Sequence, residues 1–307
     1  MFAFIRNSDD QYAALGKRSA VFTSAILLSA SISGCGGGGT ATNNVNNSNT
    51  SAGNTSTATS STLPSSYWKP ALTNTWQWQL KGTANTSYAV AVYDIDLFDT
   101  PVATIQALRA SGRKVVCYFS AGSSEDWRSD FSSFQASDMG NALSGWAGER
   151  WLDARSANVR RIMQIRLDLA VTKGCNGVEP DNVDGYANNS GFPLTAATQL
   201  DYNRFLASEA HNRGLTVALK NDTGQLSDLV GDFDFAVNEQ CHEYAECDGY
   251  QVFIANGKPV FNAEYAASYS SNPTARATLC ADASARQFHT LVLPRALDDS
   301  FRYSCEP

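Results

Sequence analysis

The stretch "GVEPDNVDGY" at residues 177–186 decides the fold of this chain. It follows the helix-like run "VTKGCN" and places Glu179, Asp181 and Asp184 within a few positions, although only 17% of the residues are charged. Buried strands of parallel sheets are mostly apolar, and the ends of such strands are where a site can use acids. The stretch therefore predicts a strand that delivers carboxylates to a functional site.

Outward from this stretch, short β-branched or aromatic runs alternate with helical patterns. The predicted strands are 75–80, 88–98, 114–122, 175–182, 215–222, 233–241, 258–265 and 288–294, and 121–155 is predicted as a long loop. Helices are expected in most gaps, for example from Pro101 to a stop at Gly112, and over 156–174. Eight strand–helix units within residues 67–307 predict a single α/β domain, a (β/α)8 TIM barrel. A doubly wound sheet is the alternative, but the first turn lacks a Gly-rich fingerprint.

Polar residues gather where the predicted strands end, which is where TIM barrels carry their active sites. The candidate site residues are Asp94, Asp96, Tyr118, Asp181, Asn182, Lys220, Asn221, Glu239, Gln240 and Glu264. Strand starts carry few charged groups. The asymmetry favours one polar site at one mouth of the barrel over a rim solvated on both sides.

Two facing carboxylates are what glycosidic bond cleavage requires, one as acid and the other as nucleophile or base. Asp181 and Glu239 are the predicted pair, because their strands lie two apart and can project toward a common point. The amides of Asn182 and Gln240 follow them and are expected to bind sugar hydroxyls. Trp78 and Tyr118 are assigned to sugar stacking, with a place in the core as the alternative.

Each remaining candidate has two interpretations. Asp94, Asp96 and Glu264 either pair with ammonium groups of a cationic sugar or form a hydrogen-bond network inside the barrel. Asp184 either lines the cleft or caps a turn. Lys220 either tunes a catalytic carboxylate or forms a structural ion pair, for which Glu179 is the expected buried partner. Asn221, which follows Lys220, is assigned to substrate binding.

Seven fragments in order resemble one known family: "WQWQL", "YDIDLFD", "VVCYFSAG", "GVEPDNVDGY", "LKND", "VNEQC" and "FNAEY". They resemble glycoside hydrolase family 114, endo-α-1,4-polygalactosaminidases with a TIM barrel, over roughly residues 68–294. The resemblance implies Asp181 and Glu239 as the catalytic acids and a galactosamine-rich polysaccharide as substrate. The chain departs from the family pattern at Glu179, where relatives carry Asp, so a carboxylate is retained.

A double displacement follows from this pairing, with Asp181 as nucleophile and a protonated Glu239 as acid and later base. Non-catalytic carbohydrate binding and polysaccharide deacetylation are the alternative functions. A Ser esterase is disfavoured because no GxSxG occurs.

The N-terminal part differs in composition from the rest. Residues 1–35 resemble a secretory signal in which Lys17 and Arg18 precede an uncharged run that ends at Cys35, as in a bacterial lipobox. Residues 36–66 carry no charge and few large apolar side chains, so they are expected to form a flexible linker. The sequence therefore predicts an exported envelope lipoprotein whose acylated Cys35 enters the lipid bilayer.

The six other cysteines form an even set in a chain expected to be exported, which favours disulfides. The pairing expected among the 15 possible is Cys117–Cys175, Cys241–Cys247 and Cys280–Cys305. Zinc is disfavoured because no CxxC is present and the three His are scattered, so no metal or cofactor is expected. The net charge of −7 disfavours nucleic acid as a partner, and the domain is expected to be a monomer.

Overall fold

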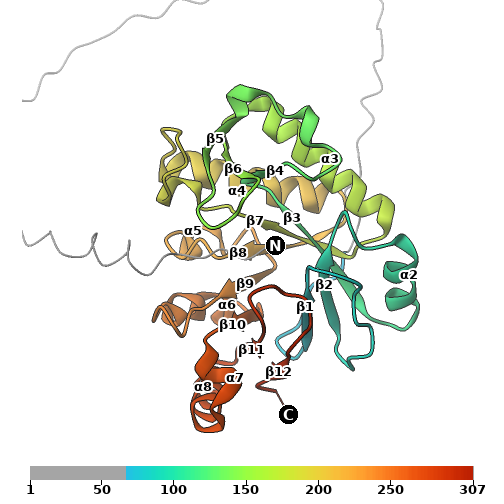
Figure 1. The fold of residues 1–307 in the computed structure, drawn as a ribbon, viewed down its shortest axis with the longest axis vertical. Coiled ribbons are helices and arrows are strands. Elements are labelled where there is room, and N and C mark those ends of the chain that lie inside the picture. The colour runs from blue at the N-terminus through green and yellow to red at the C-terminus, as the bar shows by residue number, and fades with distance from the viewer. Residues whose placement is uncertain (1–66, 307) are drawn as a thin grey trace, which may run out of the picture. The chain divides into compact units, whose positions relative to one another are not determined.

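The computed structural model describes residues 67–306, which contain one mixed α/β unit (Figure 1). The predicted signal peptide, lipidation site and linker lie outside the described residues. Eight parallel strands and one antiparallel strand form a sheet in the order β1-β2-β3-β7-β8-β9-β10-β11-β12. No helix among residues 67–306 has the length and apolar character needed to cross a membrane.

Each of the eight parallel strands lies inside a range predicted from the sequence. They are β1 Trp76–Gln79, β2 Val92–Asp96, β3 Lys114–Ser120, β7 Gly177–Asp181, β8 Thr216–Lys220, β9 Phe235–Glu239, β10 Val260–Glu264 and β11 His289–Val292. The short β12, Tyr303–Ser304, pairs antiparallel with β11. The parallel α/β prediction is therefore confirmed strand by strand.

Helices follow most of the strands. They are α2 Val102–Ala110, α3 Ala157–Lys173, α4 Ala196–Asn212, α5 Leu226–Leu229, α6 Gln251–Ala255, α7 Ala267–Ser271 and α8 Pro273–Arg286. Capping residues set both ends of α3. At its N-terminus the Ser156 hydroxyl accepts from the backbone N–H groups of Asn158 and Val159, and at its C-terminus Gly174 adopts a φ of 88°.

The expectation of eight complete strand–helix units is wrong in two places. Within the described residues, no helix follows β1 and none follows β11. The connection over 80–91 is rich in Gly, Asn, Ser and Thr and lacks an apolar stripe, so it has nothing to pack as a helix. After β11 the chain returns as β12 instead.

The parallel sheet is curled around an apolar interior, which makes the fold TIM-barrel-like. Trp76 of β1 stacks on Phe261 of β10 at 4.9 Å, and its indole N–H donates to the His289 carbonyl of β11 at 2.8 Å. Strands at opposite ends of the sheet order are therefore joined across the interior by side chains. Successive residues of β3 alternate between this interior and an outer core, with Val116 and Tyr118 inside and Val115, Cys117 and Phe119 packed with the helices.

The long segment between β3 and α3 has structure that the sequence did not predict. It forms a three-stranded antiparallel sheet of β4 Ser123–Glu125, β6 Glu149–Leu152 and β5 Met139–Ala142, in that order, with 3-10 turns η1 Phe131–Ser133 and η2 Ala136–Asp138. Two further 3-10 turns, η3 Gly185–Ala187 and η4 Cys247–Tyr250, follow β7 and β9. The insertion leaves from the carboxyl end of β3, so it stands at the same end of the sheet as Asp181.

All three predicted disulfides are confirmed. Cys117 pairs with Cys175, Cys241 with Cys247, and Cys280 with Cys305. The first fixes β3 to the end of α3, and the third fixes the C-terminal segment to α8. These bonds restrain three connections around the sheet.

Candidate active site

A single ammonium group lies at the centre of the polar site. The Nζ atom of Lys220, the last residue of β8, lies 3.0 Å from Asp181 Oδ1 and 3.0 Å from Glu239 Oε2. Its third carboxylate neighbour is Glu179, with Oε1 at 3.5 Å. The Lys220 side chain is fully buried, so the structure brings the two predicted catalytic acids together around a desolvated cation.

Asp181 is held at the end of β7 by both its side chain and its backbone. The Tyr118 hydroxyl donates to Asp181 Oδ2 at 3.0 Å. The backbone N–H groups of Ala121 and Gly122 donate to the Asp181 carbonyl at 2.8 and 3.0 Å. A Cβ atom at Gly122 would lie 1.6 Å from the Asn182 carbonyl oxygen, so only glycine permits this close approach.

Glu239 is held by neighbours from the adjacent strands. The Tyr265 hydroxyl donates to Glu239 Oε1 at 2.6 Å, and the Asn221 side-chain amide donates to Oε2 at 3.3 Å. The side-chain oxygen of Asn221, Oδ1, in turn accepts from the backbone N–H of Glu239 at 3.0 Å. Both oxygens of the carboxyl group are therefore fixed by residues that directly follow β10 and β8.

The chain turns sharply directly after Asp181, Lys220 and Glu239. The residue that follows each of them has a positive φ, which is 61° in Asn182, 48° in Asn221 and 63° in Gln240. Asn is among the few L-residues that enter this left-handed region readily, whereas Gln enters it at a greater cost. Strained backbone of this kind concentrates at functional sites.

The surroundings raise the pKa values of both Glu239 and Lys220. Burial raises the pKa of Glu239, and the Asp181 charge adds to this, while Lys220 and the Tyr265 hydrogen bond oppose it. Burial alone would lower the pKa of Lys220, but the three carboxylates raise it well above its ordinary value. Lys220 is therefore a permanent cation beside a carboxyl group that retains its proton to higher pH than usual.

Two more acids lie beneath Lys220. Glu179 is fully buried and its Oε2 accepts from the Trp78 indole N–H at 3.1 Å. Burial raises the pKa of Asp94 to about 7, and a hydrogen bond with Glu179 lowers it. The expected Glu179–Lys220 pair is thus present in the structure. Trp78 contributes an N–H donor, and its ring lies 5.0 Å below Lys220 Nζ.

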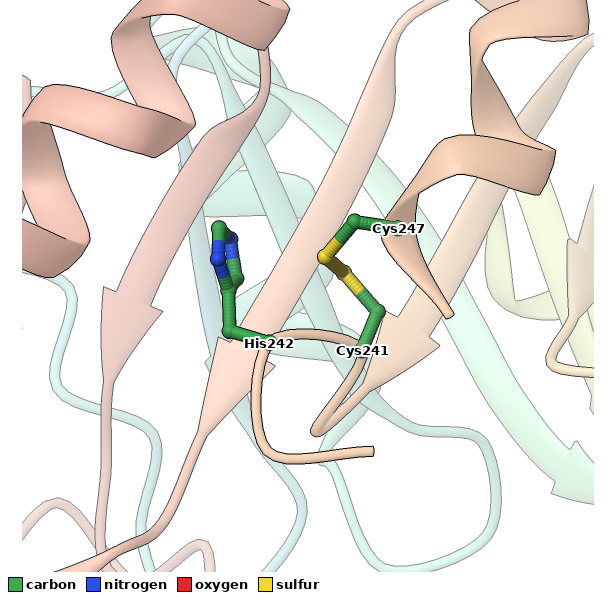
Figure 2. Close-up of side chains that lie close together, drawn as sticks. All are labelled: Cys241, His242 and Cys247. Carbon is green, nitrogen blue, oxygen red and sulfur yellow. A yellow bond between two sulfur atoms is a disulfide. The ribbon is translucent and has the colours of Figure 1, made fainter. Parts of the chain in front are cut away.

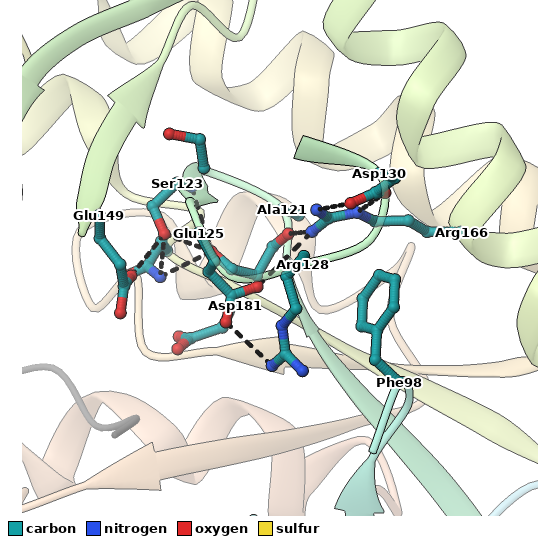
Figure 3. Close-up of polar contacts among 12 residues, drawn as sticks. Phe98, Ala121, Ser123, Glu125, Arg128, Asp130, Glu149, Arg166 and Asp181 are labelled. Atoms are coloured by element: carbon teal, nitrogen blue, oxygen red, sulfur yellow. Dashed lines mark hydrogen bonds and ion pairs between the residues drawn. The ribbon is translucent and has the colours of Figure 1, made fainter. Parts of the chain in front are cut away.

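Two other predicted site residues form hydrogen bonds with different partners. Asp96 forms two hydrogen bonds with Arg128, at 2.6 and 3.0 Å. Arg128 also pairs with Glu125, and Figure 3 shows both beside Arg166. Glu264 accepts from the His242 backbone N–H at 3.0 Å and from the Asn262 side-chain amide at 3.2 Å. Hydrogen bonds through the side chains of Asn262, Asn238 and Asn221 connect it to Glu239. Asp96 and Glu264 thus belong to hydrogen-bond networks, the second of the two interpretations that the sequence left open.

The residues at the turns have further contacts. The Asn182 side-chain amide donates to the Ser120 and Ser123 hydroxyls at 2.9 and 3.2 Å. The Gln240 side-chain amide donates to Glu243 at 2.7 Å. Asp184 is buried and occupies the N-cap position of the 3-10 turn η3, but its side chain makes no capping hydrogen bond there.

Sequence reasoning missed two residues at the site. Tyr265 is the last residue of the predicted strand 258–265, and its place at a strand end is a signal that points to the site. Glu149 of β6 accepts from the Ser123 hydroxyl at 2.7 Å, and so joins the Asn182 network (Figure 3). Its strand belongs to the insertion, for which the sequence offered no periodic pattern.

One cluster has the residue types of a metal site. Cys241, His242 and Cys247 lie close together after β9 (Figure 2). The two sulfur atoms are joined to each other in a disulfide, so neither can act as a thiolate ligand. This cluster is a structural disulfide with a neighbouring histidine.

Asp181 and Glu239 converge at the carboxyl ends of parallel strands in a TIM-barrel-like sheet. Two facing carboxyl groups at such a site supply the chemistry of glycosidic bond cleavage, which is the reaction of glycoside hydrolases. The family model described as glycoside-hydrolase family GH114 matches residues 57–307. The chain belongs to family GH114 and is a glycoside hydrolase.

Solved structures support the same assignment. The crystal structure of Aspergillus fumigatus Ega3 in complex with galactosamine is 43% identical, covers 80% of this chain and 100% of that chain, and superposes with a TM-score of 0.75. The glycoside hydrolase domain of PelA from Pseudomonas aeruginosa is 16% identical, covers 74% of this chain and 96% of that domain, and has a TM-score of 0.57, which shows the fold alone. An uncharacterized protein of Deinococcus radiodurans is 23% identical over 223 residues, which are 65% of this chain and 72% of that protein.

Proposed function

We propose that this chain hydrolyses α-1,4-linked galactosamine polysaccharide within the polymer, by a double displacement that uses Asp181 and Glu239. The observation that carries the proposal is their shared contact with Lys220 Nζ, at 3.0 Å from each. Asp181 Oδ1 and Glu239 Oε2 both contact Lys220 Nζ, so these two oxygen atoms can be no further apart than twice the 3.0 Å contact distance. This bound supports the spacing of about 5–5.5 Å that a retaining mechanism needs, rather than ~6.5–9.5 Å for inversion.

In the first step, Asp181 attacks the anomeric carbon while Glu239 donates its proton to the leaving glycosidic oxygen. The covalent glycosyl-enzyme is then hydrolysed by a water molecule that Glu239 deprotonates. Burial and the Asp181 charge raise the pKa of Glu239, which favours the proton that its role as acid requires.

The proposed substrate class rests on charge and on the comparisons. Ega3, at 43% identity, was solved with galactosamine, an amine-bearing sugar. The net charge of −7 matches a cationic polymer in sign. We assign the contacts with sugar hydroxyl and ammonium groups to Asn182, Asp184, Asn221 and Gln240, which flank the catalytic strand ends.

The proposal extends to the architecture and location of the chain. The folded part is a (β/α)8 barrel that lacks two of its outer helices. A signal, an acylated Cys35 and a linker precede it, and the acylated Cys35 would hold the enzyme at the cell envelope. The three disulfides support an oxidising compartment. Metabolic labelling with a palmitate analogue tests the anchor, since Cys35→Ala should abolish incorporation if Cys35 is the acylated residue.

The deciding experiment incubates the purified enzyme with deacetylated galactosaminogalactan and with chitosan, and follows the products by mass spectrometry. Shortened galactosamine oligomers should appear from the first polymer only. Proton NMR of the first products should show the α-anomer before mutarotation if the configuration is retained. An initial β-anomer would replace retention with inversion.

Matched variants assign the two acids. Asp181→Asn and Glu239→Gln should each lower kcat by at least about 10³-fold, with folding unchanged by circular dichroism. Asp96→Asn, on an acid held by Arg128, is the control and should retain turnover. Full activity in Asp181→Asn would remove that residue from the nucleophile role.

A further inference from the structure

The buried acids around Lys220 have few hydrogen-bond donors. Lys220 has three N–H donors, and three carboxylates already surround it: Asp181, Glu239 and Glu179. The Tyr118, Tyr265 and Asn221 donors are bound to Asp181 and Glu239, and the Trp78 indole N–H is bound to Glu179. Asp94 is 1% exposed, and neither of its carboxyl oxygens accepts from an N–H or hydroxyl group of the described residues.

Four ionised carboxylates around one ammonium group would bury several uncompensated charges, which costs several kcal/mol for each ion. A hydrogen bond between Asp94 and Glu179 requires a proton on one of them, because an ionised carboxylate has no donor. One proton supplies the missing donor and removes one negative charge at the same time.

We propose that Asp94 and Glu179 share one proton, and that this acid pair positions Lys220 on the two catalytic carboxylates. With the proton present, the pair carries one negative charge and Lys220 Nζ remains closer to Asp181 and Glu239, at 3.0 Å, than to Glu179, at 3.5 Å. Loss of the proton doubles the negative charge below the ammonium group and draws it away from the reacting atoms. Asp94 and Glu179 are therefore positioning residues rather than contacts with the sugar, and this role rests on the proposed function.

The electrostatics of the surroundings agree with a protonated pair. Burial raises the pKa of Glu179 well above its ordinary value, and the Asp94 charge adds to this. Burial raises the pKa of Asp94 to about 7. The charged and titratable groups that face the pair are Lys220 of β8, Asp181 of β7, Glu239 of β9, Tyr118 of β3 and Tyr265 after β10.

Kinetics of two Asp94 variants test the positioning role. Asp94→Leu removes the partner of Glu179, and we expect kcat to fall at least about tenfold with KM changed less than about twofold. Asp94→Asn supplies a permanent N–H donor to an ionised Glu179, so it should restore most of the lost kcat. It should also move the alkaline limb of the kcat profile to higher pH, because the proton that the wild type loses is no longer needed. A rise in KM with unchanged kcat would make Asp94 a sugar contact and overturn the proposal.

Infrared spectroscopy tests the shared proton without any substrate. Protonated acids elsewhere, such as Glu264, contribute equally to every variant and cancel in difference spectra. At neutral pH the wild type should show a carboxylic-acid carbonyl component that is lost in Asp94→Asn and persists in the control Asp96→Asn, whose acid is paired with Arg128. A band that is unchanged in Asp94→Asn would overturn the proposal even if both Asp94 variants lose activity. If the wild type cleaves no galactosamine polymer but the band behaves as expected, the proposed function fails and the shared proton stands.

Discussion

Asp181 and Glu239 approach the same nitrogen atom, Lys220 Nζ, each at 3.0 Å, although 57 residues of chain separate the two acids. The three residues end β7, β8 and β9, which are neighbours in the sheet order. A parallel sheet brings the carboxyl ends of successive strands to one edge, so three residues that are distant in the chain form one charge cluster.

Replacement of Lys220 by Met should damage catalysis more than folding. We expect kcat/KM to fall by about 10²-fold or more, because two acids then face each other without a cation between them. The Lys220 charge lowers the pKa of Glu239, so its removal should move the alkaline limb of the pH profile to higher pH. Initial rates measured across the pH range check both effects. Lys220→Arg, which retains the charge, is the control and should leave the alkaline limb less displaced.

The Tyr265 hydroxyl should tune the acid residue. Its hydrogen bond to Glu239 Oε1 lowers the pKa of Glu239, and burial raises the pKa of Tyr265 well above its ordinary value, so the donor persists. Tyr265→Phe should lower kcat by about tenfold and move the alkaline limb upward. Tyr118→Phe removes the corresponding hydrogen bond to Asp181 and should leave that limb in place. Identical profiles for the two variants would contradict the assignment of acid and nucleophile.

Glu264 should make stability depend on pH. Burial raises its pKa from an ordinary 4.5 to about 8 in the folded chain. Between these values the folded state holds a proton that the unfolded state releases, so the contribution to stability is complete below 4.5 and is lost as the pH rises toward 8. Glu264 alone should lower the free energy of unfolding by up to about 1.4 kcal/mol per pH unit in this window.

Urea titrations at several pH values check this dependence. Glu264→Gln should reduce the slope by the contribution of this one group, because the variant has no proton to lose at this position. Asp126→Asn, on an exposed acid that does not act on Glu264, should leave the slope as in the wild type. An unchanged slope in Glu264→Gln would show that Glu264 is ionised in the folded protein.

The C-terminal disulfide should stabilise the fold without serving the chemistry. Cys280–Cys305 closes a loop of 25 residues, so its removal by a double Ala substitution should cost about 3 kcal/mol. The loss should appear as a lower Tm by calorimetry, with kcat at 25 °C retained because the bond joins α8 to the segment after β12. Removal of Cys241–Cys247, which spans 6 residues, should cost less stability.

Much of the fold was predictable because its signals are local. Strands such as Gly177–Asp181 are short runs that end at turn residues, and helix α3 lies between its N-cap Ser156 and its C-cap Gly174. The absence of a helix after β1 was also predictable, because residues 80–91 lack an apolar stripe. The return of the chain as β12 and the insertion sheet were not predictable. Residues 121–155 have no periodic pattern, and β6 forms only because β4 and β5 are there to pair with it.

The amino-acid sequence by itself determined the order of the strands and the presence of acids at their ends, because both depend on which residue follows which. Only the tertiary structure decided how these acids differ. It placed Asp181 and Glu239 on Lys220, Asp96 on Arg128, and Asp94 beside Glu179 without a donor of its own. The protonation and role of a carboxyl group follow from its burial and its neighbours, and the folded chain supplies those neighbours from distant positions.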